Sequence, residues 1–326
     1  MEDTETACLS SAPIENLVRR AEIAKSLRAF FDERGFVEVH TPILSRFSVI
    51  DRHLDPIRVS GKSVGTHTGS EWYLQTSPEQ SMKRLLASGL GSCYQLGPVF
   101  RSAEYGPVHN PEFTMAEWYD LHADFEAGLV LLDQLLQRLL NCPSAERIRF
   151  DQAFSNETGL SLFESSQLAL ARWSVDNQLV ERGDWSNDWD DWVNLIFSMR
   201  VQPKLGAKRP VLVTHFPASQ AALAKLAADD ERTAERYELF YHGVELANGY
   251  HELLNPSELA NRAQIANRQR IEDGKFPLPI ENPLFQAMKI GFPDCCGCAL
   301  GFDRVVMLAC QATSLREVIP FPADRA

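Results

Sequence analysis

The sequence predicts an α+β fold in which an antiparallel sheet is flanked by helices. Three features predict it. An N-terminal segment has apolar residues at helical spacing, hairpin-like pairs of strand segments occur at 92–119 and 237–253, and a leucine-rich helical segment lies between those pairs. The 326 residues are enough for one large domain with a substantial core.

The first part of the chain predicts a tail, two helices and a strand. Residues 1–12 are polar and acidic, and we expect a flexible tail. From Pro13 to Arg34 apolar residues recur every three or four positions, which predicts a helix that ends at Gly35. The β-branched segment 36–44 predicts a strand that stops at Pro42. A second helix is expected at 77–91, with Ser77 as its cap and Pro78 at its first position.

The remaining elements alternate between strands and helices. Residues 92–101 and 111–119 predict two strands joined by the polar loop SAEYGPVHN. The leucine-rich helix is expected at 124–141. A mainly helical insertion, whose tryptophans pack a core, is expected at about 144–235. The last helix is predicted at 302–312, after a run of small residues.

The second hairpin carries two acidic residues. Pairing Glu238 with Glu245 leaves a two-residue turn at Tyr241 and His242. Because directly paired residues share a face of the sheet, this register places both carboxylates on one side.

Composition and charge bear on location and partners. The formal net charge is −12, which disfavours a nucleic-acid partner because phosphate-binding proteins concentrate positive charge. No apolar stretch is long enough to cross a bilayer, and the N-terminus has no targeting pattern. Seven cysteines without a disulfide-type spacing are typical of a reducing compartment. We therefore expect a cytoplasmic protein without a membrane partner.

Charged residues in the predicted β-structure point to nucleotide chemistry, although the GxxxxGK[ST] and GxGxxG phosphate motifs are absent. Arginine forks hold phosphates, and carboxylates hold Mg2+ against them, so a site with both suits in-line attack on a nucleoside triphosphate. The candidates on the predicted strands or at their ends are Arg101, Glu117, Glu238, Glu245 and Glu252, and Arg304 follows a glycine at the start of the last predicted helix.

Three ordered motifs resemble the catalytic domain of the class II aminoacyl-tRNA synthetases, in particular its lysyl branch. GFVEVHTPIL (35–44) resembles motif 1, which forms the dimer interface. FRSAEYGPVHNPEFTMAEWY (100–119) resembles motif 2, and GCALGFDRVVML (297–308) resembles motif 3. ELANGYHEL (245–253) is similar to the lysyl branch's EIGNGFSEL. The resemblance implies a class II catalytic domain over 13–326, ATP and Mg2+ as cofactors, and a homodimer.

Two departures from the lysyl branch narrow the implied activity. Motif 1 begins about 35 residues into the chain, which leaves no room for an anticodon-binding domain, so tRNA is not an expected partner. The shortened architecture is similar to the bacterial ligases that attach (R)-β-lysine to the ε-amine of a lysine on translation elongation factor P. Those ligases also have alanine where lysyl-tRNA synthetases have glycine in motif 3, and this chain has Ala299 there. One methyl on a pocket wall discriminates by roughly 1–3 kcal/mol, which would disfavour α-lysine.

A third departure lies in motif 2. The family pattern R-x-E corresponds here to Arg101, Ser102 and Ala103, and Glu104 follows one position later. Two alternatives stay open. Either Glu104 replaces the missing carboxylate through a shifted loop, or the backbone makes the contacts there.

The resemblance implies a role for each site residue. Ser77, Pro78 and Glu79 would hold the amino end of the substrate, Tyr119 and Glu252 its distal ammonium, Asn248 its carboxylate, and Ala299 would line the pocket. The ATP site would comprise Arg101 on the α-phosphate, Arg304 on the γ-phosphate, Gly301 beside the adenosine, and Ser102, Ala103, Asn110, Glu245 and Leu246. Glu238 and Glu245 would hold Mg2+.

Two other function classes stay open. One is an enzyme that adenylates lysine for another acceptor, such as tRNA or ammonia, and the other is a non-catalytic regulatory paralogue. Tyr119 and Glu252 favour a cationic substrate over aspartate, and the presence of both Arg101 and Arg304 argues against a non-catalytic protein.

Overall fold

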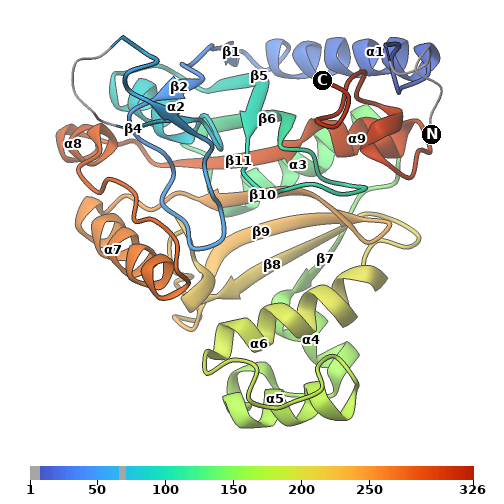
Figure 1. Ribbon diagram of the computed structural model, residues 1–326, viewed down its shortest axis with the longest axis vertical. Coiled ribbons are helices and arrows are strands. Elements are labelled where there is room, and N and C mark those ends of the chain that lie inside the picture. Colours follow the sequence, from blue (N-terminus) through green and yellow to red (C-terminus); the bar gives the residue numbers. More distant parts are fainter. Residues whose placement is uncertain (1–7, 66–70) are drawn as a thin grey trace. The chain divides into compact units, whose positions relative to one another are not determined.

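The computed structural model describes residues 8–65 and 71–326. The chain divides into two compact units (Figure 1). The first unit takes in the described residues up to Asp124, together with Arg138–Asn141 and Leu253–Ala326. The second consists of Phe125–Gln137 and Cys142–Glu252. The second unit therefore includes both the expected insertion and the hairpin that follows it.

Four strands of the first unit pair in the order β1-β5-β6-β11. β5 pairs in parallel with β1 and antiparallel with β6, and β6 pairs antiparallel with β11. A separate antiparallel sheet has the order β2-β4-β3. The strands are β1 (Val37–Glu38), β2 (Leu44–Ser45), β3 (Arg58–Ser60), β4 (Glu71–Leu74), β5 (Cys93–Phe100), β6 (Glu112–Leu121) and β11 (Cys295–Gly301).

Helix α1 packs against this sheet through its aromatic residues. The Phe31 ring stacks on Tyr94 of β5 with centroids 4.7 Å apart and lies 5.3 Å from Trp118 of β6. Gly35 then turns the chain with a φ of 74°, a conformation that favours glycine. The helices of this unit are α1 (Ile14–Asp32), α2 (Glu79–Ala87), α7 (Pro256–Glu272), α8 (Pro283–Ile290) and α9 (Phe302–Ala309).

The N-terminal tail is only partly described. Residues 1–7 of the expected tail lie outside the described residues. Within the rest of it, the Ser11 hydroxyl donates to the carbonyls of Arg316 and Ile319, and Ala12 is buried. The segment at residues 11–12 is therefore held against the C-terminal residues.

Four strands of the second unit pair in the order β10-β9-β8-β7. β9 is antiparallel to both β8 and β10, whereas β7 and β8 are parallel. The strands are β7 (Glu146–Arg149), β8 (Val211–Pro217), β9 (Thr233–Tyr241) and β10 (Val244–His251). The helices are α4 (Phe150–Thr158), α5 (Gln167–Asp176) and α6 (Trp189–Ile196), while α3 (Phe125–Leu140) contributes to both units.

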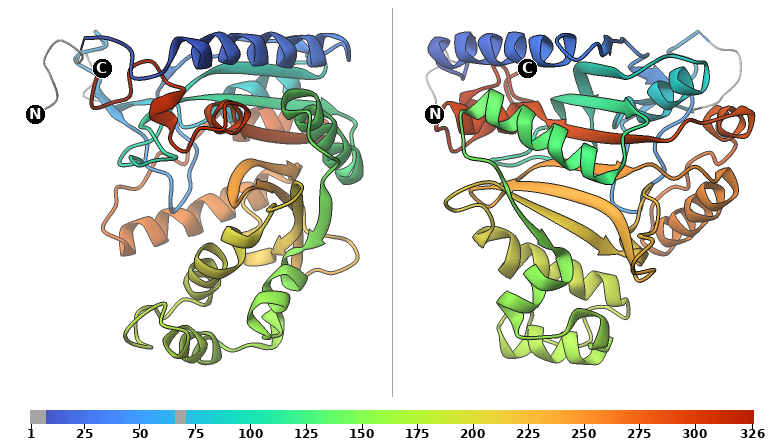
Figure 2. Two further views of the ribbon diagram at one scale, coloured as in Figure 1. Left: turned by 90° about the vertical axis from the view of Figure 1, so that its right-hand side faces the viewer. Right: turned by 180° about the vertical axis from the view of Figure 1, so that it is seen from behind.

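The prediction of a helical insertion at 144–235 is wrong at its two ends. The segment contains strands β7 and β8, and β9 begins within it at Thr233. The run VLVTHFP of β8 is apolar and rich in β-branched residues, as expected for a strand that is covered on both faces. Helices occupy the middle, where Figure 1 shows α4, α5 and α6 in one group; α4 packs against β8, and α5 against α6 (Figures 1 and 2).

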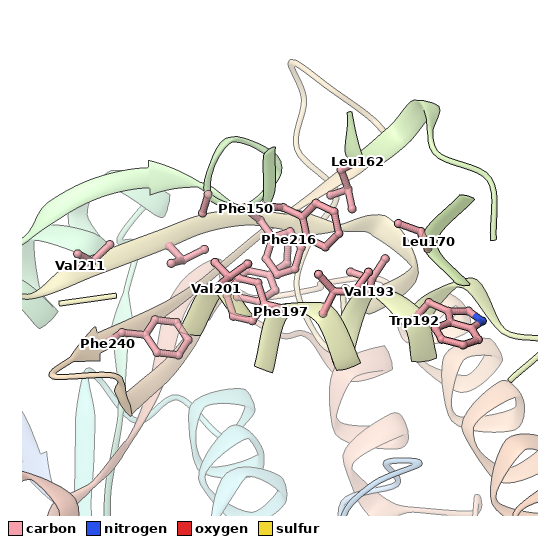
Figure 3. Packing of buried hydrophobic residues seen from close by; sticks show 14 of the residues in the cluster. Phe150, Leu162, Leu170, Trp192, Val193, Phe197, Val201, Val211, Phe216 and Phe240 are labelled. Atoms are coloured by element: carbon pink, nitrogen blue, oxygen red, sulfur yellow. The ribbon is translucent and has the colours of Figure 1, made fainter. Parts of the chain in front are cut away.

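An aromatic core joins those helices to the strands. Phe150 of α4 stacks on Phe197 with ring centroids 4.5 Å apart and lies 4.8 Å from Phe216 of β8. Trp192 is fully buried in the same cluster, so the prediction that tryptophans of this region pack a core is confirmed for it (Figure 3).

The register of the second hairpin also differs from the prediction. Tyr241 pairs with Val244, so the turn is His242–Gly243, and Glu238 pairs with Asn248 rather than with Glu245. Both turn residues have positive φ angles, 51° and 74°, which is the requirement of a type I′ hairpin turn. The His-Gly dipeptide therefore sets the register.

The α+β prediction is confirmed, although the outer strand pairs β1·β5 and β7·β8 are parallel. Within the described residues no helix has both the length and the apolar character needed to span a membrane.

Candidate active site

A buried carboxyl group, Glu117 on β6, lies at the centre of one polar cluster in the first unit. It is 3 % exposed, and it accepts hydrogen bonds from the Ser77 hydroxyl at 2.6 Å and the Tyr119 hydroxyl at 2.7 Å. Burial raises the pKa of Glu117 to about 7, and the nearby Glu79 carboxylate adds to the shift. The group therefore changes its charge near neutral pH.

Helix α2 supplies the other charges of this cluster. Glu79 and Lys83 lie one helical turn apart and form a buried ion pair with a 2.5 Å separation. The Ser77 hydroxyl accepts from the Glu79 backbone N–H, which fixes the start of the helix beside Pro78. Two carboxyl groups and one ammonium are thus buried together, and such a site would favour a bound cation over an apolar group.

Ala299 borders the same cluster. It pairs directly with Glu117 across β11 and β6, and Gly297 pairs in the same way with Tyr119. Paired residues of antiparallel strands point to the same face with adjacent β-carbons, so the Ala299 methyl lies beside the Glu117 side chain.

The motif 2 loop follows β5. The Nε of Arg101 is buried without a hydrogen-bond partner among the described residues, and its guanidinium lies over the Phe113 ring at 5.1 Å. Ala103 adopts a φ of 63°, which is rare for a residue with a β-carbon. After this bend, the Glu104 carboxylate lies 3.7 Å from the Arg101 guanidinium. Replacement of the missing carboxylate by Glu104 stays a prediction.

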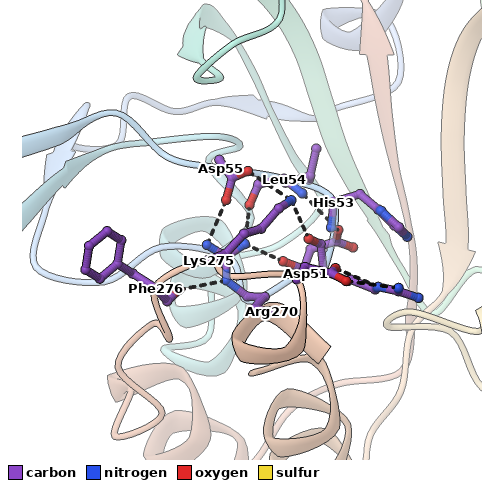
Figure 4. Close-up of polar contacts among 9 residues, drawn as sticks. Asp51, His53, Leu54, Asp55, Arg270, Lys275 and Phe276 are labelled. Atoms are coloured by element: carbon purple, nitrogen blue, oxygen red, sulfur yellow. Dashed lines mark hydrogen bonds and ion pairs between the residues drawn. The ribbon is translucent and has the colours of Figure 1, made fainter. Parts of the chain in front are cut away.

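A charged cluster around Arg270 supports the motif 2 loop, and we call it the Asp55 clamp. The Asp55 carbonyl accepts from the Ser102 N–H at 2.7 Å. The Asp55 carboxylate pairs with Arg270 at 2.8 Å and Lys275 at 3.0 Å (Figure 4). Although burial opposes the shift, these two cations hold the pKa of Asp55 below its usual value. Arg270 also donates to the carbonyls of Asp51, Leu54 and Phe276.

Asn110 has both ends of its side-chain amide engaged within the protein. It donates to the Glu112 carbonyl at 2.6 Å and accepts from the Ala323 N–H at 3.0 Å. These contacts tie the motif 2 hairpin to the C-terminal segment. A contact between Asn110 and nucleotide stays a prediction.

Arg304 lies in the first turn of α9, and this helix begins directly after Gly301, the last residue of β11. Its guanidinium donates to Nε2 of His109 at 2.9 Å and to the Val108 carbonyl at 3.3 Å. The neighbouring Asp303 accepts from Arg20 and from the Thr114 N–H at 2.8 Å. The loop of the motif 2 hairpin and the start of β6 are therefore both connected to α9.

The second unit brings the expected metal ligands together. Asn248 lies opposite Glu238, and Glu245 lies opposite Phe240, two residues from Glu238 on the same strand. Glu238 and Glu245 therefore share a face, as expected, although by a different pairing. Arg236 lies on that face as well and contacts the Glu238 carboxylate at 2.5 Å.

The other two predicted residues of this unit are deeply buried. Leu246 is 2 % exposed and lies at the bulge between Glu245 and Ala247. Glu252 is 1 % exposed and forms an isolated bridge with Ala224. A buried carboxylate is suited to a cationic ligand, so the geometry agrees with the predicted role of Glu252 without testing it.

Comparisons with known proteins agree with this geometry. A family model described as tRNA synthetases class II (D, K and N) matches residues 7–325. The chain belongs to this class II family. Two curated relatives are each named elongation factor P--(R)-beta-lysine ligase. The protein of Yersinia enterocolitica is 44 % identical, and that of Edwardsiella ictaluri is 45 % identical, over 316 residues that cover 97 % of either chain.

The class II family uses ATP, and two carboxylates of the second unit would suit a Mg2+ ion. Mg2+ keeps several waters and takes one or two carboxylates in addition to substrate phosphates. Glu238 and Glu245 supply two such groups on one face. Within the described residues, no cluster of three or more His, Cys, Asp or Glu side chains could hold a metal ion.

The structure places three charged residues in these polar clusters to which the sequence analysis gave no role: Glu117, Lys83 and Arg236. Glu117 lies two residues from Tyr119 on one strand face, which was the available signal. Lys83 follows Glu79 by four positions on a helix. Arg236 precedes Glu238 by two positions, but nothing in a single sequence distinguishes it from an exposed strand arginine.

Proposed function

We propose that this class II chain activates (R)-β-lysine with ATP and transfers it to the ε-amine of a lysine on translation elongation factor P. The observation that carries the proposal is the 44–45 % identity to two ligases of that name over 97 % of either chain. The alanine opposite Glu117 supports it further, because a methyl at this position narrows the predicted amino-acid pocket.

In the first step the substrate carboxylate attacks the α-phosphorus of ATP, and pyrophosphate leaves. Arg101, with its buried Nε, would hold the α-phosphate, and Arg304 the γ-phosphate. Glu238 and Glu245 would hold Mg2+, which neutralises phosphate charge when bound. Positioning and charge neutralisation carry this step, because no protein nucleophile is needed.

In the second step the ε-amine of the acceptor lysine attacks the carbonyl carbon of the adenylate. An amide bond forms, the bond from that carbon to the phosphate oxygen breaks, and AMP leaves with the electron pair. The attacking amine loses one proton to solvent water. The cluster around Glu79 and Glu117 would hold the amino groups of the substrate and keep its carbonyl in place during transfer.

The proposal includes a homodimer formed through α1 and β1 in the cytoplasm. Motif 1 covers these elements, and Ile14, Val18 and Val37 are exposed apolar residues on them. Ile14 and Val18 lie one turn apart on α1, and exposed apolar side chains that share a helix face are typical of an interface.

ATP–pyrophosphate exchange tests the activation step. We expect exchange that depends on (R)-β-lysine, and its loss in Arg304→Ala, because the γ-phosphate would lose its cation. Arg232→Ala, which changes an arginine that is 64 % exposed and has no predicted role in the site or the interface, is the matched control and should leave exchange unchanged. Equal exchange in Arg304→Ala and the wild type would show that the active site is assigned wrongly.

A further inference from the structure

We propose that Arg236 is the positioning residue that holds Glu238 and Asn248 in place for Mg2+ and for the substrate. The inference rests on the proposed function, because it assigns Glu238 to the metal and Asn248 to the substrate carboxylate. It concerns a residue that lies between these two subsites in the second unit.

Arg236 makes three directional contacts. Its Nη2 donates to Oε1 of Glu238 at 2.5 Å, its Nη1 to the Gln220 carbonyl at 2.7 Å, and its Nε to Oδ1 of Asn248 at 3.3 Å. The side chain is 17 % exposed. A guanidinium carries five N–H donors in a rigid plane, so one side chain can orient all three acceptors at once.

Aromatic rings fix the plane of this guanidinium. It lies 4.5 Å from the centroid of the Phe216 ring and 6.0 Å from that of Tyr250. Tyr250 is paired with Arg236 across β9 and β10, and its hydroxyl accepts from the Asn248 amide at 2.9 Å. Arg236, Tyr250 and Asn248 therefore form one connected polar network on the face that carries Glu238.

The charge of Arg236 serves the acidic pair as well. Glu238 and Glu245 both act electrostatically on the guanidinium. A cation beside two carboxylates on one sheet face offsets part of their mutual repulsion. The side chain thus aims the Glu238 carboxylate and also lies close to the negative charge of both glutamates.

The competing interpretation is that the Arg236–Glu238 ion pair stabilises the fold and has no effect on metal or substrate binding. Metal binding separates the two interpretations, because loss of an outer residue that orients a metal ligand typically weakens metal affinity about 10–100-fold. A merely structural residue would lower thermal stability without changing the metal affinity of the folded protein.

The experiment measures Mn2+ binding by electron paramagnetic resonance, with a non-hydrolysable ATP analogue present and no turnover. Wild type, Arg236→Gln and Arg236→Lys are compared with Arg232→Gln, which removes an exposed arginine beside β9. We expect Arg236→Gln to weaken Mn2+ binding about 10–100-fold and to raise KM for (R)-β-lysine. Arg236→Lys should recover much of the Mn2+ affinity but not the KM, because one ammonium cannot orient Glu238 and Asn248 together.

Wild-type Mn2+ affinity in folded Arg236→Gln would overturn the inference. If circular dichroism shows that Arg236→Gln does not fold, Arg236→Lys decides, because an unchanged KM for (R)-β-lysine in that variant contradicts the positioning role. Absence of lysine-dependent exchange in the wild type would instead refute the proposed function, so the two failures are distinguishable.

Discussion

Ala299 and Glu117 lie directly opposite each other on β11 and β6, so that a single methyl group borders a buried carboxyl group whose pKa is about 7. The Ser77 and Tyr119 hydroxyls both donate to that carboxyl group. The residue expected to select the substrate is therefore adjacent to the groups expected to bind its amines.

Replacing Ala299 by glycine should weaken the preference of the enzyme for (R)-β-lysine over α-lysine. Without the methyl, α-lysine gains access to the space beside Glu117, and the ratio of kcat/KM for α-lysine to that for (R)-β-lysine should rise about 10–100-fold. ATP–pyrophosphate exchange with each amino acid measures the ratio. Ala116→Gly makes the same change on the opposite face of β6 and should leave the ratio unchanged. An unchanged kcat/KM ratio in Ala299→Gly would show that Ala299 does not line the amino-acid pocket.

Glu117 should make stability depend on pH. Its pKa is raised from 4.5 to about 7 in the folded protein, so folding favours the protonated form. The free energy of unfolding should fall as pH rises from about 4.5 to about 7 and then level off, and the total for this group is about 3 kcal/mol. Glu117→Gln cannot ionise and should lack this fall. Urea unfolding of the substrate-free wild type and Glu117→Gln at pH 5 and pH 7.5 measures the change in the free energy of unfolding. An equal change in the two proteins would contradict the raised pKa of Glu117.

Arg270 should support ATP binding through the Asp55 clamp. Arg270→Met leaves three backbone carbonyls and part of the Asp55 charge without their donor, and we expect a loss of about 3 kcal/mol in the free energy of unfolding. Because Asp55 holds Ser102, the KM for ATP should rise more than the KM for lysine. Arg268→Met, an exposed position of the same helix, is the control. Equal increases in the two KM values would indicate a purely structural role.

The aromatic core of the second unit should dominate the stability of its helices. Phe150 is 1 % exposed and contacts the rings of Phe197 and Phe216. Phe150→Ala should lower the free energy of unfolding by about 3–5 kcal/mol. Leu168→Ala, at a position 75 % exposed, should change it by less than about 0.5 kcal/mol. Denaturant unfolding of both variants checks the prediction, and similar losses in both would show that the core assignment is wrong.

Local patterns were sufficient for many of the elements. Helix α1 and strands β5 and β6 were predicted from apolar spacing and from strand-forming composition, and the structure confirms them within a few residues. Strands β7 and β8 lie in a segment dominated by helices, and the four-residue β7 gains its stability from pairing with β8 rather than from its own sequence. Such tertiary pairing is invisible to a local pattern.

The candidate site was predicted as a set of residues, but its contacts were not. Glu238 and Glu245 share a face because the turn at His242–Gly243 pairs Glu245 with Phe240, two residues from Glu238. The expected direct pairing of the two glutamates would also have placed them on one face. The bend at Ala103 that brings Glu104 to Arg101, and the network of Arg236, depend on the folded backbone. A single sequence carries no signal for either.

The central claim is that this class II chain transfers (R)-β-lysine to translation elongation factor P. The intact mass of purified elongation factor P after incubation with the protein, ATP, Mg2+ and (R)-β-lysine tests it most directly. We expect a mass increase of one lysyl unit at a single lysine. No increase, together with exchange that still depends on lysine, would contradict the protein acceptor and indicate that the adenylate is used by another amine.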